Sequence, residues 1–530
     1  MFKSPYHYKD FSLSLNLHMN KVEKITNMKK VEGRGSERLY LAGYVLDTNM
    51  AFVEEEQFFD DLYSSYNSLQ KYNGTFCGVL IKKDEVTIFS DRMTTMKCYF
   101  AVQRNILYLS CDVERVVKLS PCMPERDEAS LAEMLFRGNM SPNKTHYKGI
   151  STLAIGEVAS VASGSNKFRF YKYDTIFGEG VIDKRPIEEV AEDIVEDLTN
   201  CISNSYRYHR KYLGATLSGG RDSRMLVGIA KKQGIEFPMI TIDTCGPVDE
   251  YDVMKPLLDY WKAKSHNYPY QEGYFQRYAK TTWQNAGFMT NMHTWFAPAM
   301  KDRKNLRRLY ITGMCVDNMI DDNNYGLKNF IDGSFPMDID EVVDKIVSGA
   351  TDVGALLSHE FMEHLTALYR ARLKEVVVPF MQSPRGVKDF YIQTRGVNDV
   401  LLICHMFRSR FASFSPFLCN NVIDKVLMLD TAHCGEKMYE LLFENIDKEL
   451  SLIPSTRQKE PLPYAKVREF NYKPMIDWAY EQLKDGYMMR NHFIDSGKME
   501  SYFKARKEAN RALGAESIAI LAMNCALESR

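Results

Sequence analysis

A short glycine-containing loop between a predicted strand and a predicted helix constrains this chain more than any other feature. Residues 213–217 are largely apolar, residues 218–223 read Ser-Gly-Gly-Arg-Asp-Ser, and an amphipathic helical pattern follows at once. A strand, a glycine-rich turn and a helix in this order form an anion site, because the N–H groups of the first helical turn and the helix dipole face the loop. Adjacent glycines let the backbone approach phosphate oxygens, and Asp222 beside a phosphate is typical of a magnesium ligand.

The loop therefore predicts a nucleotide phosphate site. Its candidate members are Leu217, Ser218, Gly219, Gly220, Asp222 and Ser223. The competing interpretation is a plain turn in which Asp222 or Ser223 caps the helix. We favour the phosphate site, because the hexapeptide is more specific than an isolated pair of glycines.

Charge and hydropathy exclude several classes of protein. The 530 residues favour two to four domains, and 68 Lys and Arg against 69 Asp and Glu give a formal net charge of −1. This balance disfavours a nucleic-acid partner. Apolar stretches stay shorter than the roughly 18 residues of a spanning helix, and charges at Lys3, Lys9 and Asp10 argue against a signal peptide. We expect a cytoplasmic protein without a membrane partner.

Eleven cysteines are scattered along the chain without a CxxC pair, and the histidines are equally dispersed. This pattern favours reduced core thiols over disulfides or zinc ligands.

The chain divides into two parts of different periodicity. Residues 1–175 are β-rich, and residues 186–530 open with an amphipathic helix. In the first part we expect antiparallel strands at 38–46, 76–82, 85–90, 97–102, 106–111 and within 150–172, with a helix at 128–136. In the second part we expect strands at 213–217, 238–243 and 308–312, a helix reaching residue 233 between the first two, and mainly helices from 340 to 530. Strand, helix and strand at this spacing form a βαβ unit, so a parallel sheet is expected.

With both parts in view, the chain resembles the asparagine synthetase family, including its β-lactam synthetase and lasso-peptide cyclase branch, along almost its full length. The most specific match is the Ser-Gly-Gly-x-Asp-Ser loop of the N-type ATP pyrophosphatases. Further matches follow in the family's order at Asp249-Glu250, 313–317, 415–418 and 457–459. The resemblance implies an α/β protein. Residues 1–175 would be a glutaminase-like (class II amidotransferase-like) domain, an Ntn-hydrolase-like antiparallel β-sheet with helices. Residues 186–530 would be a synthetase domain, a parallel sheet of adenine nucleotide α-hydrolase-like fold with a helical C-terminal part.

The resemblance also implies a chemistry. ATP and Mg²⁺ would activate a carboxylate as an acyl-adenylate with release of pyrophosphate, and an amine would then attack. Asp222 and Asp317 are the implied metal ligands, because both follow strands whose carboxyl ends should converge; taken singly, each fits a turn or surface carboxylate better. Lys459 is the implied catalytic cation, with a solvated lysine as an equal alternative. The remaining nucleotide-binding candidates are Thr241, Asp243, Gly313 and Arg457.

Two stretches depart from the family's pattern. Residues 313–318 read Gly-Met-Cys-Val-Asp-Asn, so Met314 stands where asparagine-forming members carry a carboxylate and β-lactam-forming members a tyrosine. Aspartate is therefore a doubtful substrate, and no acceptor base is visible. Cys419 stands where the family has an aspartate, and Asp321 and Asp322 are expected to lie in a polar loop.

The N-terminal part lacks the family's nucleophilic cysteine, since the chain begins Met-Phe-Lys-Ser and its first cysteine is Cys77, inside a predicted strand. We expect Cys77 to be a core thiol and glutamine hydrolysis to be lost. Asn73-Gly74 and Asp91-Arg92 resemble pairs of the glutamine site. Their alternative roles are a turn and a structural salt bridge.

These observations support a carbon–nitrogen ligase whose partner is a small molecule or peptide carrying a carboxylate and an amine, with a homodimer left open. A second hypothesis is a nucleotide-binding regulatory protein without catalysis. A third is tRNA thiolation or lysidine-type modification, which uses the same loop but for which the near-neutral charge gives no support.

Overall fold

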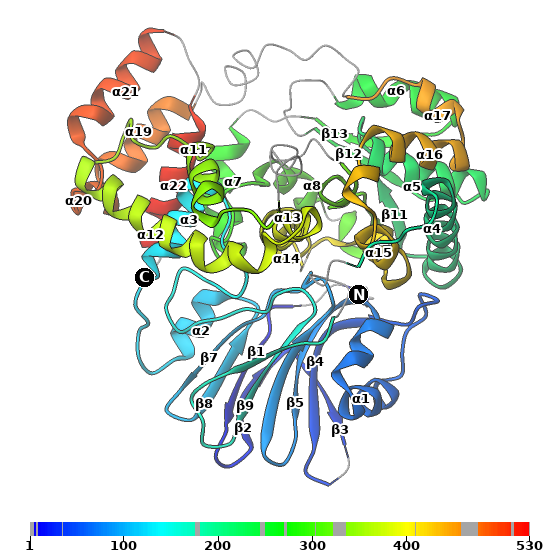
Figure 1. Ribbon diagram of the computed structural model, residues 1–530, viewed down its shortest axis with the longest axis horizontal. Helices are drawn as coiled ribbons and strands as arrows, with labels where there is room; N and C mark the ends of the chain where they lie inside the picture. Colours follow the sequence, from blue (N-terminus) through cyan, green and yellow to red (C-terminus); the bar gives the residue numbers. More distant parts are fainter. Residues whose placement is uncertain are drawn as a thin grey trace.

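The computed structural model describes residues 5–6, 9–33, 35–174, 181–243, 250–269, 273–302, 304–321, 335–408, 410–456, 475–509 and 513–528. Two antiparallel sheets form one end of the molecule, and a parallel sheet with most of the helices forms the other (Figure 1). The chain is therefore the mixed α/β protein that the sequence predicts, with the antiparallel strands first and the parallel strands after them.

The antiparallel end is a pair of sheets packed face to face. The four-stranded sheet has the order β2-β1-β8-β7 and the six-stranded sheet the order β10-β9-β6-β5-β4-β3. Their bounds are β1 (Ser12–Asn16), β2 (Lys21–Thr26), β3 (Lys29–Glu32), β4 (Arg38–Leu46), β5 (Asn73–Ile81), β6 (Glu85–Ser90), β7 (Tyr99–Gln103), β8 (Ile106–Ser110), β9 (Glu157–Ala162) and β10 (Arg169–Lys172).

Alternation along β5 explains why the sandwich has two cores. Cys77 and Val79 point between the sheets and pack against Leu13 and Leu15 of β1. The neighbouring positions Phe76 and Leu80 point outward. There they are covered by α1 (Glu55–Ser64) and η1 (Tyr66–Lys71). Cys77 is fully buried, as predicted for a core thiol.

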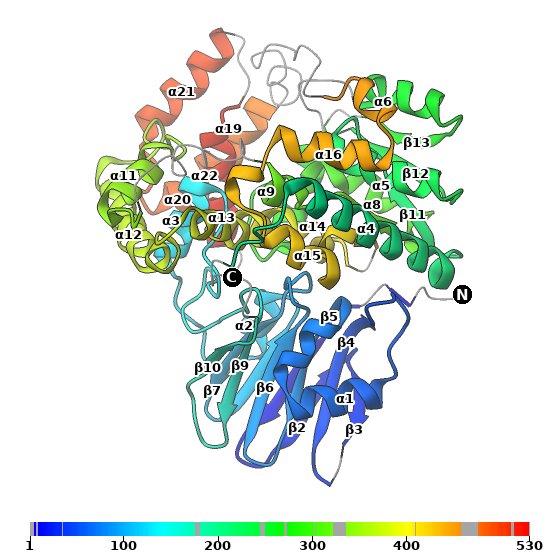
Figure 2. The ribbon, with the colours of Figure 1, turned by 45° about the vertical axis from the view of Figure 1, so that its right-hand side comes forward.

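The parallel sheet has the strand order β13-β12-β11-β14-β15, with every neighbouring pair parallel. Its strands are β11 (Leu213–Thr216), β12 (Met239–Ile242), β13 (Ser265–Tyr268), β14 (Leu309–Ile311) and β15 (Ala412–Phe414). The helices α4 (Ile187–His209), α5 (Arg221–Lys232), α6 (Glu250–Tyr260) and α16 (Glu436–Ile446) lie around it (Figure 2). Leu213 and Ala215 of β11 share one buried cluster with apolar residues of all four helices.

A second group of helices lies beside the parallel sheet, at the left of Figures 1 and 2. It contains α3 (Glu128–Arg137), which belongs to the first part of the sequence but packs against α12 (His359–Val377) and α22 (Ala515–Glu528). Phe136 of α3 stacks on Tyr369 of α12 with ring centroids 5.1 Å apart. The first part of the chain is thus joined to the last through a shared apolar core.

The remaining described helices are α2 (Val113–Leu119), α7 (Tyr274–Asn285), η2 (Thr294–Phe296), α8 (Ala297–Lys301), η3 (Asn305–Arg307), α9 (Val316–Ile320), α11 (Ile339–Ser348), η5 (Val378–Phe380), α13 (Pro384–Tyr391), η6 (Ile392–Val400), α14 (Leu402–Met406), η7 (Pro416–Leu418), α15 (Asn420–Leu427), η8 (Thr431–His433), α17 (Glu449–Leu452), α19 (Ile476–Lys484), α20 (Tyr487–Arg490) and α21 (Ser496–Glu508). Among them η6 is a π-helix. None of the helices that the structure describes is long and apolar enough to cross a membrane. The ten cysteines within the described ranges are free, and seven of them are buried as expected for core thiols, whereas Cys122 is exposed.

Candidate functional site

The parallel sheet reverses its strand order between β11 and β14. From β11 the chain moves outward through β12 to β13, whereas β14 leads to β15 on the other side. The loops after β11 and β14 therefore diverge, and a crevice forms at the carboxyl ends of these two strands, where open α/β sheets bind their ligands. Residues 218–223 follow β11 and residues 313–317 follow β14. The structure thus places both candidate segments at the point where the strand order reverses.

These two segments are in direct contact. A Cβ atom added at Gly313 would lie 2.6 Å from Cβ of Asp222 and 2.8 Å from the backbone nitrogen of Ser223. Such distances leave no room for a side chain at position 313. A glycine is required there because the turn after β14 rests on the first turn of α5.

A cavity of about 250 Å³ opens at this contact. Six of the predicted residues line it, namely Leu217, Ser218, Gly220, Asp222, Ser223 and Gly313. The other lining residues are Thr216, Ile242, Glu250, Phe296, Thr312, Met314 and Phe411. The lining thus combines the polar loop, Glu250 and two threonines with the apolar side chains of Ile242, Phe296, Met314 and Phe411.

The loop is held in shape by its own hydroxyl groups. The Ser218 amide donates to Oγ of Ser223 at 3.0 Å, and the Gly220 amide donates to Oγ of Ser218 at 3.2 Å. Gly220 is the N-cap of α5 and provides no side-chain acceptor. The interpretation of Asp222 or Ser223 as the helix cap is therefore wrong, because both lie inside the first helical turn.

The Gly219 amide already faces an anion. It donates to Oε2 of Glu250 at 2.6 Å, at the start of α6. A phosphate oxygen brought to this amide would compete with the Glu250 carboxylate. Glu250 belongs to the Asp249-Glu250 match, of which Asp249 lies outside the described residues.

The segment before residue 457 is fixed against the same loop. The amide of Thr456 donates to the Gly219 carbonyl at 3.1 Å. The buried guanidinium of Arg224 donates to the carbonyls of Leu450 and Pro454, each at 3.0 Å, and also to that of Ile453. Arg457 and Lys459 themselves lie outside the described residues, one and three positions beyond Thr456.

Close packing explains the glycine at position 219. A Cβ atom there would lie 2.7 Å from Cβ of Val253 on α6 and 2.9 Å from Cγ2 of Thr456. The loop is thus wedged between α6 and the segment that ends at Thr456.

One tyrosine is hydrogen-bonded to the predicted metal ligand Asp222. The hydroxyl of Tyr439 on α16 donates to Oδ1 of Asp222 at 2.9 Å. Burial and the negative charge of Asp222 raise the pKa of Tyr439 well above its usual value, and Asp317 adds to that effect. Tyr439 therefore stays a hydrogen-bond donor to Asp222 at any physiological pH.

The carboxylates fit a magnesium ion that is shared with phosphate. Within the described ranges no group of three or more histidine, cysteine, aspartate or glutamate side chains could hold a metal alone. Magnesium in nucleotide sites usually takes one or two protein carboxylates and completes its shell with phosphate oxygens and water. Asp222 and Asp317, on adjacent turns, match that donor set. Asp317 itself does not line the cavity.

Arg221 forms a second charged contact beside Asp222. Its guanidinium lies 3.6 Å from the centroid of the Tyr439 ring, 2.6 Å from a Glu436 oxygen and 3.6 Å from an Asp321 oxygen. Asp321 is only 4% exposed. The expectation of a polar loop at Asp321 is therefore wrong, because this carboxylate is buried next to Arg221 of the loop at residues 218–223. Asp322 lies outside the described residues.

Thr241 and Asp243 are placed away from the cavity wall. The Thr241 hydroxyl is buried against Oγ of Ser265 at 2.9 Å, and the Asp243 amide donates to the Tyr268 carbonyl at 3.0 Å. The residue of β12 that lines the cavity is Ile242.

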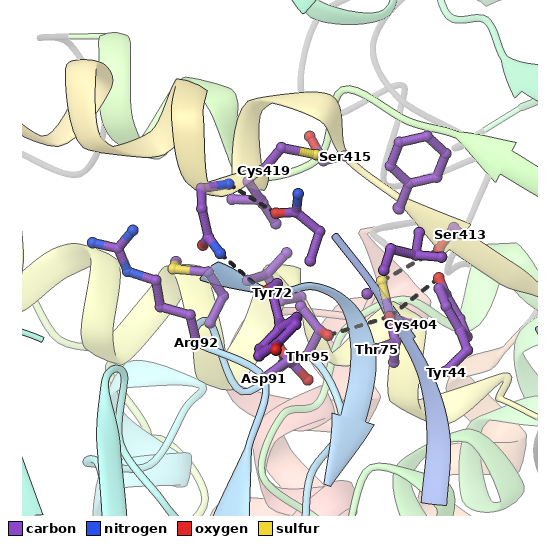
Figure 3. Close-up of a pocket in the computed structure, with 18 of the residues that line it drawn as sticks. Tyr44, Tyr72, Thr75, Asp91, Arg92, Thr95, Cys404, Ser413, Ser415 and Cys419 are labelled. Carbon is purple, nitrogen blue, oxygen red and sulfur yellow. Dashed lines mark hydrogen bonds between the residues drawn. The ribbon is translucent and has the colours of Figure 1, made fainter. Parts of the chain in front are cut away.

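The residues that resemble a glutamine site line a second, smaller cavity where the sandwich meets the parallel-sheet part (Figure 3). Asn73 accepts the Asn420 amide at 2.9 Å. Arg92 pairs with Asp174 and with Asp424, both at 2.6 Å. The alternative role of Asp91-Arg92 as a structural salt bridge is confirmed for Arg92, because its partners join the two ends of the molecule.

This second cavity is small, at about 40 Å³. It has room for a few water-sized molecules but not for an amino acid. Met314 lines both cavities, so its side chain lies between the two spaces. Cys419, also in the wall, has its sulfur 3.2 Å from that of Cys201.

Several of these contacts could not be found from the sequence. Tyr439 and Glu436 lie more than 200 residues after the loop, in a helix whose pattern shows only that one face is apolar. A tyrosine in such a helix is usually a packing residue, so no local signal marks it as a partner of Asp222.

Comparisons with known proteins give no family for this chain. No family model matches it, and no curated protein matches it. Among solved structures, glutamine phosphoribosylpyrophosphate amidotransferase from B. subtilis, complexed with ADP and GMP, is similar at 9% identity and a TM-score of 0.19. The alignment covers 44% of this chain and spans 59% of the length of that one. The structure of the allosteric regulatory enzyme of purine biosynthesis is similar at 8% identity, over 50% of this chain and 74% of that one, with a TM-score of 0.20. Superpositions of this quality support no argument about activity.

Proposed function

We propose that this protein is an ATP- and Mg²⁺-dependent ligase that forms amide bonds, of the type found in the asparagine synthetase family. It would activate a carboxylate as an acyl-adenylate, release pyrophosphate and join the acyl group to ammonia or to an amine of the substrate. The observation that carries the proposal is the contact of the Asp222 loop with the Gly313 turn at the reversal point of the parallel sheet.

The phosphate loop would bind the leaving group. The helix dipole of α5 and the amides of its first turn attract an anion, and the Gly219 amide already donates to a carboxylate. Asp222 and Asp317 would hold Mg²⁺, which neutralises charge on phosphate oxygens. Arg457 and Lys459 follow a segment that Arg224 fixes beside this loop. Cations there would stabilise the charge that develops as pyrophosphate leaves.

The apolar walls support the second half of the reaction. Phe296, Phe411 and Met314 line the cavity together with the polar loop. Apolar walls exclude water, which would otherwise hydrolyse an activated acyl group before the amine attacks. Met314 stands where the family has a carboxylate or a tyrosine, and its thioether cannot accept a proton. The attacking amine therefore has to be deprotonated by another group or enter the site as the free base.

ATP binding by calorimetry and pyrophosphate release with a panel of carboxylates test the proposal. The wild type is expected to bind ATP with Mg²⁺, to release pyrophosphate when its carboxylate substrate is present, and to release AMP once an amine is added. Gly219→Ala pushes a methyl group against Val253, and Asp222→Asn removes a metal ligand. Each is expected to weaken ATP·Mg²⁺ binding at least tenfold. Asp259→Asn is the matched control, because Asp259 is an exposed carboxylate paired with Lys255 on α6.

Two results would contradict the proposal. Unchanged ATP affinity in both loop variants would remove the phosphate site itself. Binding that depends on the loop but gives no pyrophosphate with any carboxylate would instead support the nucleotide-binding regulatory protein.

A further inference from the structure

A separate cavity of about 700 Å³ lies between the helical group and η6. Its walls come from the ends of α3 and α11, from α12 and α13, and from the beginning of η6. A volume of this size is within the range of small-molecule sites. The cavity shares no lining residue with the phosphate-loop cavity.

The charged residues on its wall are all cationic. Arg137, Lys345 and Arg395 line the cavity, and no aspartate or glutamate does so among the described residues. Two carboxylates on the flanking helices pair with basic side chains. Glu133 pairs with Arg137 at 3.0 Å and lies 3.7 Å from Arg372. Asp399 lies 3.0 Å from His293 and 3.5 Å from Arg395. Burial opposes the charged form of Asp399, but its interactions with His293 and Arg395 hold its pKa below the usual value.

Arg137 keeps capacity to donate. One of its terminal nitrogens, Nη2, donates to Glu133 and Ser141, and Nε donates to the Asn139 carbonyl at 3.4 Å. The other, Nη1, is buried without a hydrogen-bond partner among the described residues. Buried guanidinium nitrogens usually have hydrogen-bond partners, because burying one without an acceptor is energetically unfavourable. The Nη1 group of Arg137 therefore points to a ligand that accepts its hydrogen bond.

The rest of the wall is aromatic. Phe136 stacks on Tyr369, and Phe390 meets Tyr391 edge-on with centroids 5.7 Å apart. The Arg137 guanidinium lies 5.7 Å from the Phe390 ring centroid. Aromatic faces next to guanidinium groups favour a flat or apolar body that carries a negative charge at one edge.

We propose that this cavity binds an organic anion with an aromatic or apolar body, such as an aryl or acyl carboxylate, sulfonate or phosphate. The site is independent of the proposed ligase activity. The π-helix connects the two regions, because Gly396 packs against Cys315 of the turn after β14. Residues 394–395 face the anion cavity on the same helix.

Fluorescence titration of the full chain with 8-anilinonaphthalene-1-sulfonate tests the site, since this probe is an aromatic anion. N-phenyl-1-naphthylamine has the same aromatic body without the sulfonate and serves as the neutral probe. The variants are Lys345→Gln, which changes an exposed residue, and Arg395→Gln. Arg370→Gln is the matched control, because Arg370 is an exposed arginine of α12 that pairs with Asp344 and does not line the cavity. A filling variant, Ala350→Trp, completes the set.

We expect both charge variants to weaken sulfonate binding at least threefold while the neutral probe binds them as it binds the wild type. Arg370→Gln should bind both probes normally, and Ala350→Trp should lose both. The proposal is overturned if either charge variant binds the sulfonate within threefold of wild type, or if the neutral probe weakens in parallel. Because Lys345 is exposed, Lys345→Gln should fold normally, and it therefore tests the proposal even if Arg395→Gln does not fold.

Discussion

Lys97 is a lysine buried where the sandwich meets η6. Its ammonium donates to Oδ1 of Asn398 at 2.8 Å and to Oγ1 of Thr94 at 3.3 Å. Burial lowers the pKa of Lys97 to about 7, although the nearby Asp91 opposes that shift. In the unfolded chain a lysine keeps its proton until about pH 10.4.

Stability should therefore rise with pH between about 7 and 10. In that window the unfolded chain binds more protons than the folded one, so the free energy of unfolding increases by up to about 1.4 kcal/mol per pH unit. Lys97→Met removes this pH-dependent contribution. We expect the variant to have a higher free energy of unfolding than the wild type, with the difference largest near pH 7 and smaller towards pH 10. Urea unfolding at pH 7.5, 8.5 and 9.5 measures the slopes. Lys148→Met, at an exposed lysine, should keep the wild-type slope, and equal slopes for all three proteins would contradict the burial of Lys97.

Residues whose role depends on local spacing could be predicted from the sequence, and residues whose role depends on tertiary contact could not. Ser218 and Ser223 shape the loop five positions apart, which the hexapeptide already contains. Asp321 shows the opposite case. The residues next to Asp321 in the sequence do not indicate that it is buried beside Arg221, one hundred positions earlier.

At the scale of elements, α5 links the loop at residues 218–223 to a distant segment. Arg224, in its first turns, donates to three carbonyls between residues 450 and 454. Its own pKa is lowered to about 10 by burial and by the neighbouring Arg221. Because no carboxylate is among these acceptors, the arginine acts through backbone hydrogen bonds alone, and it sets where the chain approaches Gly219.

Arg224→Met is expected to release this segment from α5. Trypsin should then cleave faster at Arg457 or Lys459, because local opening governs proteolysis when reclosing is fast. Mass spectrometry of timed digests measures the rate. Lys232→Met at the far end of α5 is the control, since Lys232 makes a single exposed contact with the Asn445 carbonyl. Equal rates in both variants would show that Arg224 does not hold the segment.

The elements that could be predicted are those with strong internal patterns. β4 and β6 coincide with the predicted strands at 38–46 and 85–90, because their apolar residues are continuous and bounded by turns. No sequence pattern predicts β13 (Ser265–Tyr268) or β15 (Ala412–Phe414). Both are short edge strands, and the hydrogen bonds of β12 and β14 determine them more than their own composition does.

At the scale of the whole molecule, Arg92 joins the sandwich to the helical part. It pairs with Asp174, which is fully buried, and with Asp424 on α15. Asn420 and Lys97 make further hydrogen bonds across the same boundary. We expect the two ends to unfold together rather than in separate steps.

Arg92→Met should lower the free energy of unfolding by about 3–5 kcal/mol, because it removes the buried arginine that pairs with the buried Asp174 carboxylate. Asp424→Asn is the matched comparison and should cost less, since Asp424 is partly exposed and Asp174 keeps its arginine. Urea unfolding followed by circular dichroism and by tyrosine and tryptophan fluorescence measures both. Two separate transitions in the wild type, or an equal loss in the two variants, would contradict a coupled boundary.

The position of α3 has a consequence for the synthesis of the protein. Its apolar face rests on α12 and α22, yet α22 begins at Ala515, about 380 residues after α3 ends. At roughly 5–20 residues per second the ribosome needs about 20–75 s to supply that partner. During this interval Leu131 and Leu135 emerge on a nascent chain without their native cover. Folding of this chain on the ribosome should therefore depend on chaperones at the stage when only its first half has been made.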